Sequence, residues 1–202
     1  MKVYAVVPAK AKSRRLPGKN FSRFGESNLL AHCVQKLLDS RIPERIYIST
    51  DNVGKVQQAL RDVPGRGRVL ILVRPPKLAT DSARTEEVVA DVVARINVPE
   101  DYAILLCQAT TPLWTVEHLQ QAFRLFQTHG CPALVAVRPD YTPNGAFWLL
   151  CKHRFEKTGE LYQPDMEFYE MDWISSIDID YPHQLTIAES IYRQLRDGRH
   201  LV

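Results

Sequence analysis

The chain has 202 residues, of which 45% are hydrophobic and 24% charged, as expected for one folded domain with a sizeable core. A formal net charge of +3 does not indicate a nucleic-acid-binding protein, and no apolar run is long enough for a signal sequence or a membrane span. The cysteines are widely spaced and form no C-x-x-C pair, at Cys33, Cys107, Cys131 and Cys151. This spacing predicts reduced thiols in a cytoplasmic protein and argues against a structural zinc.

Short apolar runs alternate with amphipathic stretches along the chain. This alternation predicts a single α/β domain, in which helices cover both faces of a mostly parallel, Rossmann-like sheet in a three-layer sandwich. Ligands of such sheets bind beyond the carboxyl ends of the strands. In chain order, the predicted elements are a strand at Val3–Pro8, a helix at Ser27–Ser40, a strand at Arg45–Thr50, a helix at Asn52–Arg61, a strand at Val69–Val73, a helix at Arg84–Ile96, a strand at Tyr102–Cys107, a helix at Val116–His129 capped by Thr115, strands at Ala133–Val137 and Gly145–Cys151, an extended segment at Ile174–Ile179 and a helix at Tyr181–Asp197.

Basic residues gather directly after the first predicted strand. Residues 8–20 read P-A-K-A-K-S-R-R-L-P-G-K-N, with five basic side chains within ten positions. The segment lacks the spacing of a Walker loop, but its small residues, its Pro17-Gly18 turn and its cations suit a triphosphate. An exposed basic loop that only keeps the protein soluble is the alternative.

This segment resembles the amino-terminal signature of the acylneuraminate cytidylyltransferases, or CMP-sialic acid synthetases, which reads P-A-R-x-x-S-K-R-[LI]-P-x-K-N. Arg14 stands where the family has a lysine and keeps the charge, whereas Lys10 replaces an arginine and loses a planar bidentate donor. The CMP-Kdo synthetases share a related L-P-G-K, so this motif by itself identifies a superfamily. The identical positions are Ser13, Leu16, Pro17, Lys19 and Asn20.

Five more segments resemble motifs of the same family, in the same order and near strand ends. They are S-T-D at 49–51, R-P followed by L-A-T-D-S-A within 74–83, Q-A-T-T-P-L at 108–113, P-N-G-A at 143–146 and I-D-I-D at 177–180. Taken singly, each has an ordinary alternative, such as a strand end, a helix cap or a tight turn. Together they imply a sheet of the nucleotide-diphospho-sugar transferase type.

The resemblance also implies roles for individual residues. Lys10, Ser13, Arg14 and Lys19 would hold the phosphates of CTP, and Asn20 would orient the loop. Cytosine and ribose would lie beside Arg74, Ala83 and Thr85. The acceptor sugar would lie near Gln108, Thr110 and Asn144.

Two carboxylates close the series of motifs, at Asp178 and Asp180. Because residues i and i+2 of a strand share one face, both carboxylates are expected to converge on one point. Hard oxygen ligands suit Mg²⁺, so the pair is a predicted metal site; capping aspartates before the last helix are the alternative. With Arg14 and Lys19, these residues form the predicted catalytic set, and we expect Lys19 and Asp180 to lie together.

Two departures from the family pattern affect acceptor recognition. Trp114 replaces an arginine, and only Arg138–Thr142 fills the place of an inserted segment that supplies dimer contacts and basic residues to the sugar carboxylate. The resemblance implies a magnesium-dependent transfer of CMP from CTP to an acidic 2-keto sugar of the sialic-acid type. It also implies a homodimer, which the missing insert leaves open. A CMP-Kdo-type enzyme, another sugar nucleotidyltransferase or a non-catalytic nucleotide-binding relative are the alternatives.

Overall fold

The computed structural model describes residues 1–98, 101–130 and 133–198. Its centre is a seven-stranded sheet in the order β5-β4-β1-β6-β8-β7-β9. The strands β5, β4, β1 and β6 run parallel, β8 runs antiparallel to both of its neighbours, and β9 runs parallel to β7. The predicted, mostly parallel sheet is therefore confirmed. The strand bounds are β1 (Lys2–Pro8), β4 (Arg45–Thr50), β5 (Val69–Val73), β6 (Tyr102–Cys107), β7 (Ala133–Val137), β8 (Pro143–Cys151) and β9 (Glu167–Glu170).

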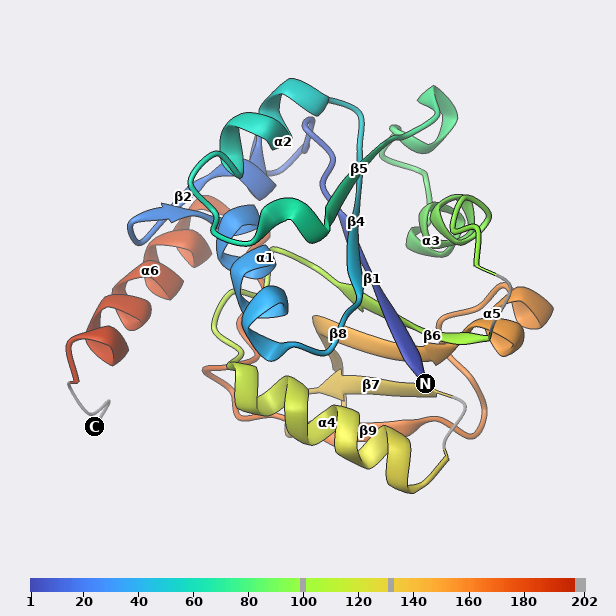
Figure 1. The fold of residues 1–202 in the computed structure, drawn as a ribbon. Helices are drawn as coiled ribbons and strands as arrows, with labels where there is room; N and C mark the ends of the chain where they lie inside the picture. Colours follow the sequence, from blue (N-terminus) through green and yellow to red (C-terminus); the bar gives the residue numbers. More distant parts are fainter. Residues whose placement is uncertain (99–100, 131–132, 199–202) are drawn as a thin grey trace.

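Helices cover both faces of the sheet and produce the expected three layers (Figure 1). The helices α1 (Leu29–Ser40), α2 (Val53–Ala59), α4 (Val116–Thr128) and α6 (Pro182–Arg196) share one apolar core with the sheet. The helices α3 (Thr85–Val93) and α5 (Lys152–Thr158) pack on the other face. Neighbouring residues of β1 alternate between the two cores, because successive side chains of a strand point to opposite faces.

Side-chain caps fix where several helices begin. The Asn28 side chain accepts a hydrogen bond from the Ala31 amide, so α1 starts at Leu29, later than predicted. The residues just before it pair as a small hairpin of β2 (Arg23–Phe24) and β3 (Ser27–Asn28). Thr115 caps α4 as predicted.

The structure differs from the sequence-based prediction near the carboxyl end of the chain. The segment Ile174–Ile179 is not a strand: Asp172 accepts hydrogen bonds from the amides of Ile174 and Ser175, which closes a turn there. The helix α5 and the edge strand β9 were not predicted. Both are short and carry several charged residues, so neither has a clear apolar period.

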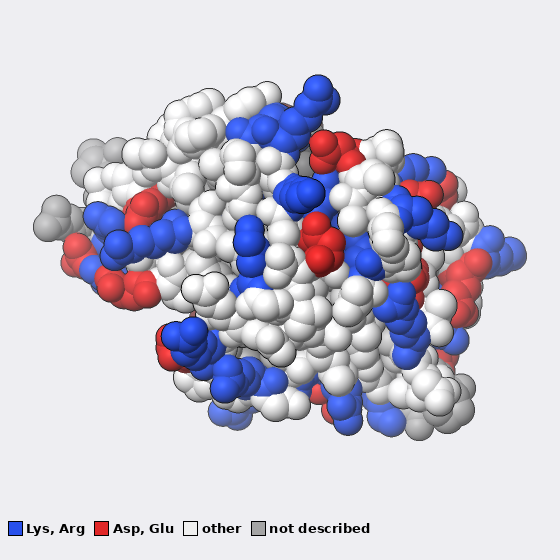
Figure 2. Space-filling view, turned by 90° about the horizontal axis from the view of Figure 1, so that it is seen from above, with Lys and Arg blue, Asp and Glu red and all other residues white. Residues whose placement is uncertain are grey.

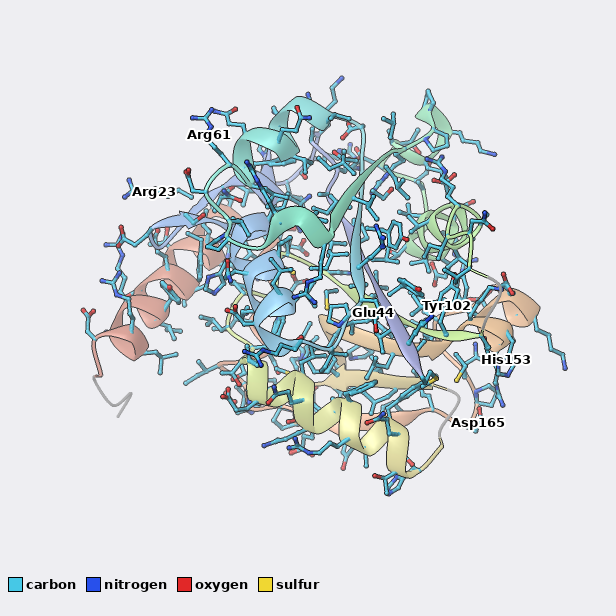
Figure 3. All side chains as sticks on the ribbon, in the orientation of Figure 1. Arg23, Glu44, Arg61, Tyr102, His153 and Asp165 are labelled. Atoms are coloured by element: carbon cyan, nitrogen blue, oxygen red, sulfur yellow. The ribbon has the colours of Figure 1, made fainter. Side chains whose placement is uncertain are left out.

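Exposed polar pairs lie on the side of the sheet where β6 begins. His153 of α5 contacts Asp101, just before Tyr102 of β6, with Nδ1 and Oδ2 2.7 Å apart. Arg154 pairs with Asp165 at 2.8 Å, and Figure 3 shows Tyr102, His153 and Asp165 on this side of the molecule. Exposed pairs of this kind contribute at most about 1 kcal/mol, so we assign them a structural role only.

Cys33 and Cys107 are buried and Cys151 is half-buried, and all three are free thiols, whereas Cys131 lies outside the described residues. Among the helices that the structure describes, none combines the length and apolarity that crossing a bilayer requires.

Candidate active site

A cleft of about 690 Å³ opens at the carboxyl edge of the parallel strands. Figure 2 looks onto the molecule from above and shows basic side chains around acidic ones in the middle of this face. Most of the predicted site residues line the cleft, and only Ala83, Asn144 and Asp178 do not. The lining residues are Pro8, Lys10, Ser13, Arg14, Arg15, Leu16, Lys19, Asn20, Arg74, Asp81, Thr85, Gln108, Thr110 and Asp180.

The basic loop, Lys10–Asn20, is held from within and by the neighbouring strand. The Asn20 side-chain amide donates to the Lys10 carbonyl at 3.0 Å, which ties the two ends of the loop together. The Ala11 amide donates to the Asp51 carboxylate at 2.6 Å, just beyond β4. The S-T-D motif therefore fixes the start of this loop, a role that its ordinary appearance in the sequence did not suggest.

The predicted Pro17-Gly18 turn brings Lys19 into the cleft. The Lys19 amide donates to the Leu16 carbonyl at 3.1 Å, and Gly18 has a φ of 70°. A proline followed by a residue with positive φ is typical of a type II turn, which favours glycine at its third position. Lys19 then begins a short 3₁₀ turn, Lys19–Phe21.

The basic loop meets Asp180, the second aspartate of the predicted pair, as the sequence predicts. The Lys19 ammonium lies 2.8 Å from Asp180 Oδ1, across 161 positions of sequence. The Arg15 guanidinium lies 2.9 Å from Asp180 Oδ2. A hydrogen bond with the Tyr181 side chain raises the pKa of Arg15, and the negative charge of Asp180 raises it further. Arg15 was not among the predicted site residues, although it lies in the same basic run.

Lys10 and Arg14 extend the positive surface toward the other side of the cleft. The Lys10 ammonium donates to Asp81 Oδ1 at 2.6 Å and to the Thr80 carbonyl at 3.1 Å. Hydrogen bonding by Lys10 lowers the pKa of Asp81, which keeps that carboxylate ionised. Arg14 is exposed and lines the cleft beside Ser13. An anion entering the cleft would therefore meet several cations.

Asp178 lies deeper than Asp180. Burial is the largest influence on its pKa, which is raised, and the Thr110 side chain opposes that shift by hydrogen bonding. The adjacent Ile179 amide donates to the Thr110 carbonyl at 2.8 Å, which fixes this segment against the loop that follows β6. Asp178 Oδ1 is buried and has no hydrogen-bond partner. A buried carboxylate oxygen without a partner is costly, and a cation would relieve that cost.

The two aspartates suit a hard divalent ion. Within residues 1–98, 101–130 and 133–198, no group of three or more histidine, cysteine, aspartate or glutamate side chains could hold a metal. A pair of carboxylates with further oxygens from a ligand's phosphates is the donor set that Mg²⁺ uses at such sites. The donors around Asp178 and Asp180 therefore fit a metal that arrives with a nucleotide.

The predicted base and ribose residues separate into two groups. Thr85 begins α3 and lines the cleft, and Ala83 is half-buried just before it. Arg74 also lines the cleft, but its guanidinium donates to Ser49 Oγ, the Ser49 carbonyl and the Leu78 carbonyl, at 3.2, 3.0 and 3.2 Å. Burial lowers the pKa of Arg74. Its bonds brace the end of β4, so contact with a ligand would be an additional role.

Gln108 and Thr110 line the cleft, whereas Asn144 lies behind it. The Asn144 side chain is only 3% exposed, and its amide donates to Ser176 Oγ at 3.0 Å and to the Met171 sulfur at 3.4 Å. Asn144 therefore holds the start of β8 against the segment before Asp178. Contact between Asn144 and a sugar stays a prediction.

Gly145 allows β8 to approach this group of side chains. Its φ is 80°, and an added Cβ would lie 3.0 Å from Thr111 Oγ1 and 3.1 Å from Gln108 Oε1. We expect Gly145→Ala to cost about 1–2 kcal/mol in backbone conformation, which lowers the melting temperature by about 2–8 °C in a chain of this size. Calorimetric melting measures the effect. Gly67→Ala, with no atom within 4 Å of the added Cβ, is the control. Equal melting temperatures for both variants would contradict the described packing.

Comparison with known proteins agrees with this geometry. A family model described as cytidylyltransferase matches residues 4–135. The chain is 26% identical over 227 residues to N-acylneuraminate cytidylyltransferase of Escherichia coli O18:K1:H7, an alignment that covers 96% of this chain. It is 31% identical over 142 residues to CMP-N,N'-diacetyllegionaminic acid synthase of Legionella pneumophila, which covers 69% of this chain.

These alignments cover 52% of the Escherichia coli protein and 59% of the Legionella protein, so the chain spans little more than half the length of these relatives. Among solved structures, the CTP complex of CMP:2-keto-3-deoxy-manno-octonic acid synthetase has a TM-score of 0.75 at 12% identity. That alignment covers 96% of this chain and 100% of the other. At this identity the likeness shows a shared fold.

Proposed function

Because this chain belongs to the cytidylyltransferase family, we propose that it transfers CMP from CTP to an acidic 2-keto sugar of the nonulosonic-acid class and releases pyrophosphate. One observation carries the proposal: the basic loop and Asp180 meet at one cleft, where Lys19 lies 2.8 Å from the Asp180 carboxylate. The proposed class of acceptor rests on the relatives from Escherichia coli and Legionella pneumophila, whose names specify acidic sugars of this class.

The nucleotide would occupy the cleft with its phosphates on the basic loop. Lys10, Arg14 and Lys19 offer ammonium and guanidinium donors there, and Ser13 adds a hydroxyl. Cations within hydrogen-bond distance of phosphate oxygens give charge-assisted bonds, about twice as strong as neutral ones. In the structure Lys19 and Lys10 pair with Asp180 and Asp81, so binding of phosphates would exchange one set of ion pairs for another.

Asp178 and Asp180 would hold Mg²⁺. The ion would neutralise phosphate charge and assist departure of pyrophosphate. The donor set supports this assignment through the partnerless Asp178 Oδ1 and the half-buried Asp180 carboxylate.

The reaction places the sugar hydroxyl in line with the α-phosphorus of CTP. A new oxygen–phosphorus bond forms, the bond between the α-phosphorus and the bridging oxygen breaks with release of pyrophosphate, and the sugar hydroxyl loses its proton to solvent. Arg14 and Lys19 would stabilise the charge that develops on the phosphates, while Gln108 and Thr110, which also line the cleft, would contact the acceptor. The chain's contribution is therefore mainly positioning and charge stabilisation.

The test is incubation with CTP, Mg²⁺ and a panel of acidic sugars, with detection of pyrophosphate and the mass of any CMP-sugar. We expect product with at least one nonulosonic acid. Product only with 3-deoxy-octulosonic acid would favour a CMP-Kdo-type enzyme, which the shared fold makes the second candidate. Calorimetric binding of CTP without pyrophosphate from any sugar would identify a non-catalytic relative.

The cytoplasm is the compartment we propose, because it supplies CTP and keeps free thiols such as Cys33 and Cys107 reduced. The homodimer implied by the family resemblance stays a prediction.

A further inference from the structure

A lysine of helix α1 lies beneath the loop that follows β6. Lys36 donates to the carbonyls of Pro112 and Trp114, at 2.8 and 2.7 Å. Its ammonium also lies 3.9 Å from the centre of the Trp114 ring. Trp114 is 1% exposed and packs edge-to-face on Phe147, with ring centres 5.9 Å apart. A cation from a different element therefore contacts the position where the family pattern has an arginine.

The loop that Lys36 holds, Gln108–Trp114, is irregular between β6 and the cap of α4. Backbone carbonyls in an irregular segment lack regular partners and need hydrogen-bond donors from elsewhere. Two carbonyls of this loop accept hydrogen bonds from the Lys36 ammonium. Both carbonyls belong to residues within five sequence positions of Thr110, which lines the cleft. The position of these carbonyls therefore affects the position of Thr110.

The same loop carries contacts to the aspartate pair. The Thr110 carbonyl accepts from the Ile179 amide at 2.8 Å, and the Thr110 side chain bonds to Asp178. Thr111 Oγ1 donates to the Asn144 carbonyl at 2.9 Å. A continuous series of contacts thus runs from the α1 lysine through this loop to Asp178.

Among the described residues, no carboxylate is found to offset the charge of Lys36. The titratable groups that face it are His32 and Cys33 of α1, Cys107 of β6 and His118 of α4. Burial lowers the pKa of Lys36 to about 7. Burial also lowers the pKa values of the two histidines, that of His32 to about 3. It raises the pKa values of the two thiols, that of Cys33 to about 12.

We propose that Lys36 is a positioning residue, whose ammonium holds the Gln108–Trp114 loop and thereby places Asp178 for metal and triphosphate. The inference rests on the proposed function for its catalytic consequence, whereas its structural consequence is independent of turnover. Lys36 is not among the residues that line the cleft, so it acts through the loop.

Lys36→Met tests the proposal, because it keeps the apolar stem and removes the donors and the charge. Hydrogen bonds to charged groups contribute about 1.5–3 kcal/mol, so we expect exchange of the Ile179 amide hydrogen to accelerate about 10- to 150-fold. Calorimetric affinity for Mn²⁺ in the presence of CTP should fall, and kcat should fall by about a hundredfold with little change in KM for CTP. Lys36→Arg, which keeps a cation, should recover part of each loss.

Lys157→Met is the matched control, since Lys157 is an exposed lysine of α5. It should leave all three measurements unchanged. Unchanged Ile179 exchange and Mn²⁺ affinity in Lys36→Met would overturn the proposal. If wild-type protein shows no transfer to any sugar, the proposed function fails while exchange and metal binding still decide the role of Lys36.

The wild-type protein provides a second test that does not depend on folding of a variant. Between pH 6 and 8 we expect the Lys36 side-chain NMR signals to titrate, since burial lowers the pKa of Lys36 to about 7, whereas the thiols and His32 that face it titrate outside this range. The ring signals of His118, whose pKa burial lowers, are followed in the same titration and should change with a different midpoint. Loss of the proton weakens the bonds to the two carbonyls. Ile179 exchange, corrected for its intrinsic pH dependence, should accelerate with the same midpoint. Exchange that does not follow the Lys36 titration would contradict the proposal.

Discussion

Asp180→Asn is expected to reduce cytidylyl transfer by at least about a hundredfold, because it removes one of two carboxylates assigned to the metal. The side chain keeps its size, and its new amide cannot replace an anionic ligand. Pyrophosphate release with saturating CTP, Mg²⁺ and acceptor measures the effect. Excess Mg²⁺ should restore little activity, since the amide also loses the attraction to Lys19 and Arg15.

The same substitution should leave the fold intact. The Asp180 side chain is 27% exposed, so its ion pairs contribute at most about 1 kcal/mol to stability. The melting temperature should therefore fall by no more than about 4 °C. Asp62→Asn, at an exposed carboxylate beyond α2, is the control and should retain full activity. Wild-type-like turnover by Asp180→Asn would rule out the metal assignment.

Lys19→Met is expected to weaken CTP binding about 10- to 150-fold, because one hydrogen bond from a charged donor to a phosphate is lost. The substitution also removes one of the two cations that pair with Asp180, so phosphate oxygens would face a carboxylate whose charge Arg15 offsets in part. Isothermal calorimetry with CTP in the absence of acceptor isolates this effect from chemistry.

Lys157→Met again serves as the control, with an expected affinity equal to wild type. The loss should also shrink at high ionic strength, because salt screens the contribution of a partly exposed cation. An unchanged affinity for CTP in Lys19→Met would show that the triphosphate lies elsewhere.

The layered fold follows from the periodicity of the sequence. The strand β6 is buried at every position, and its uninterrupted apolar run makes it easy to predict. The strand β9 and helix α5 lack such a signal, because each is short, charged and peripheral. The segment before Asp178 was predicted to be extended, but the Asp172 side chain bonds to nearby amides and closes a turn instead.

The candidate site was predicted mainly through motif resemblance, combined with the rule that loops at the carboxyl edge of a parallel sheet converge. That reasoning brought together Lys19 and Asp180 from opposite ends of the chain, and the structure confirms their contact. It did not assign a role to Arg15, Asp51 or Lys36. Their importance depends on which backbone groups and carboxylates they meet, and such long-range partners leave no periodic signal in a single sequence.

The most direct test of the account is paramagnetic broadening of backbone amide signals by Mn²⁺ in the presence of CTP. We predict that signals from residues 10–20 and from Ile179 and Asp180 broaden together, and that CTP is required for the strongest effect. Asp178→Asn combined with Asp180→Asn should abolish the broadening in both segments. Broadening confined to one segment, or centred elsewhere in the molecule, would contradict a shared site for the nucleotide and its metal.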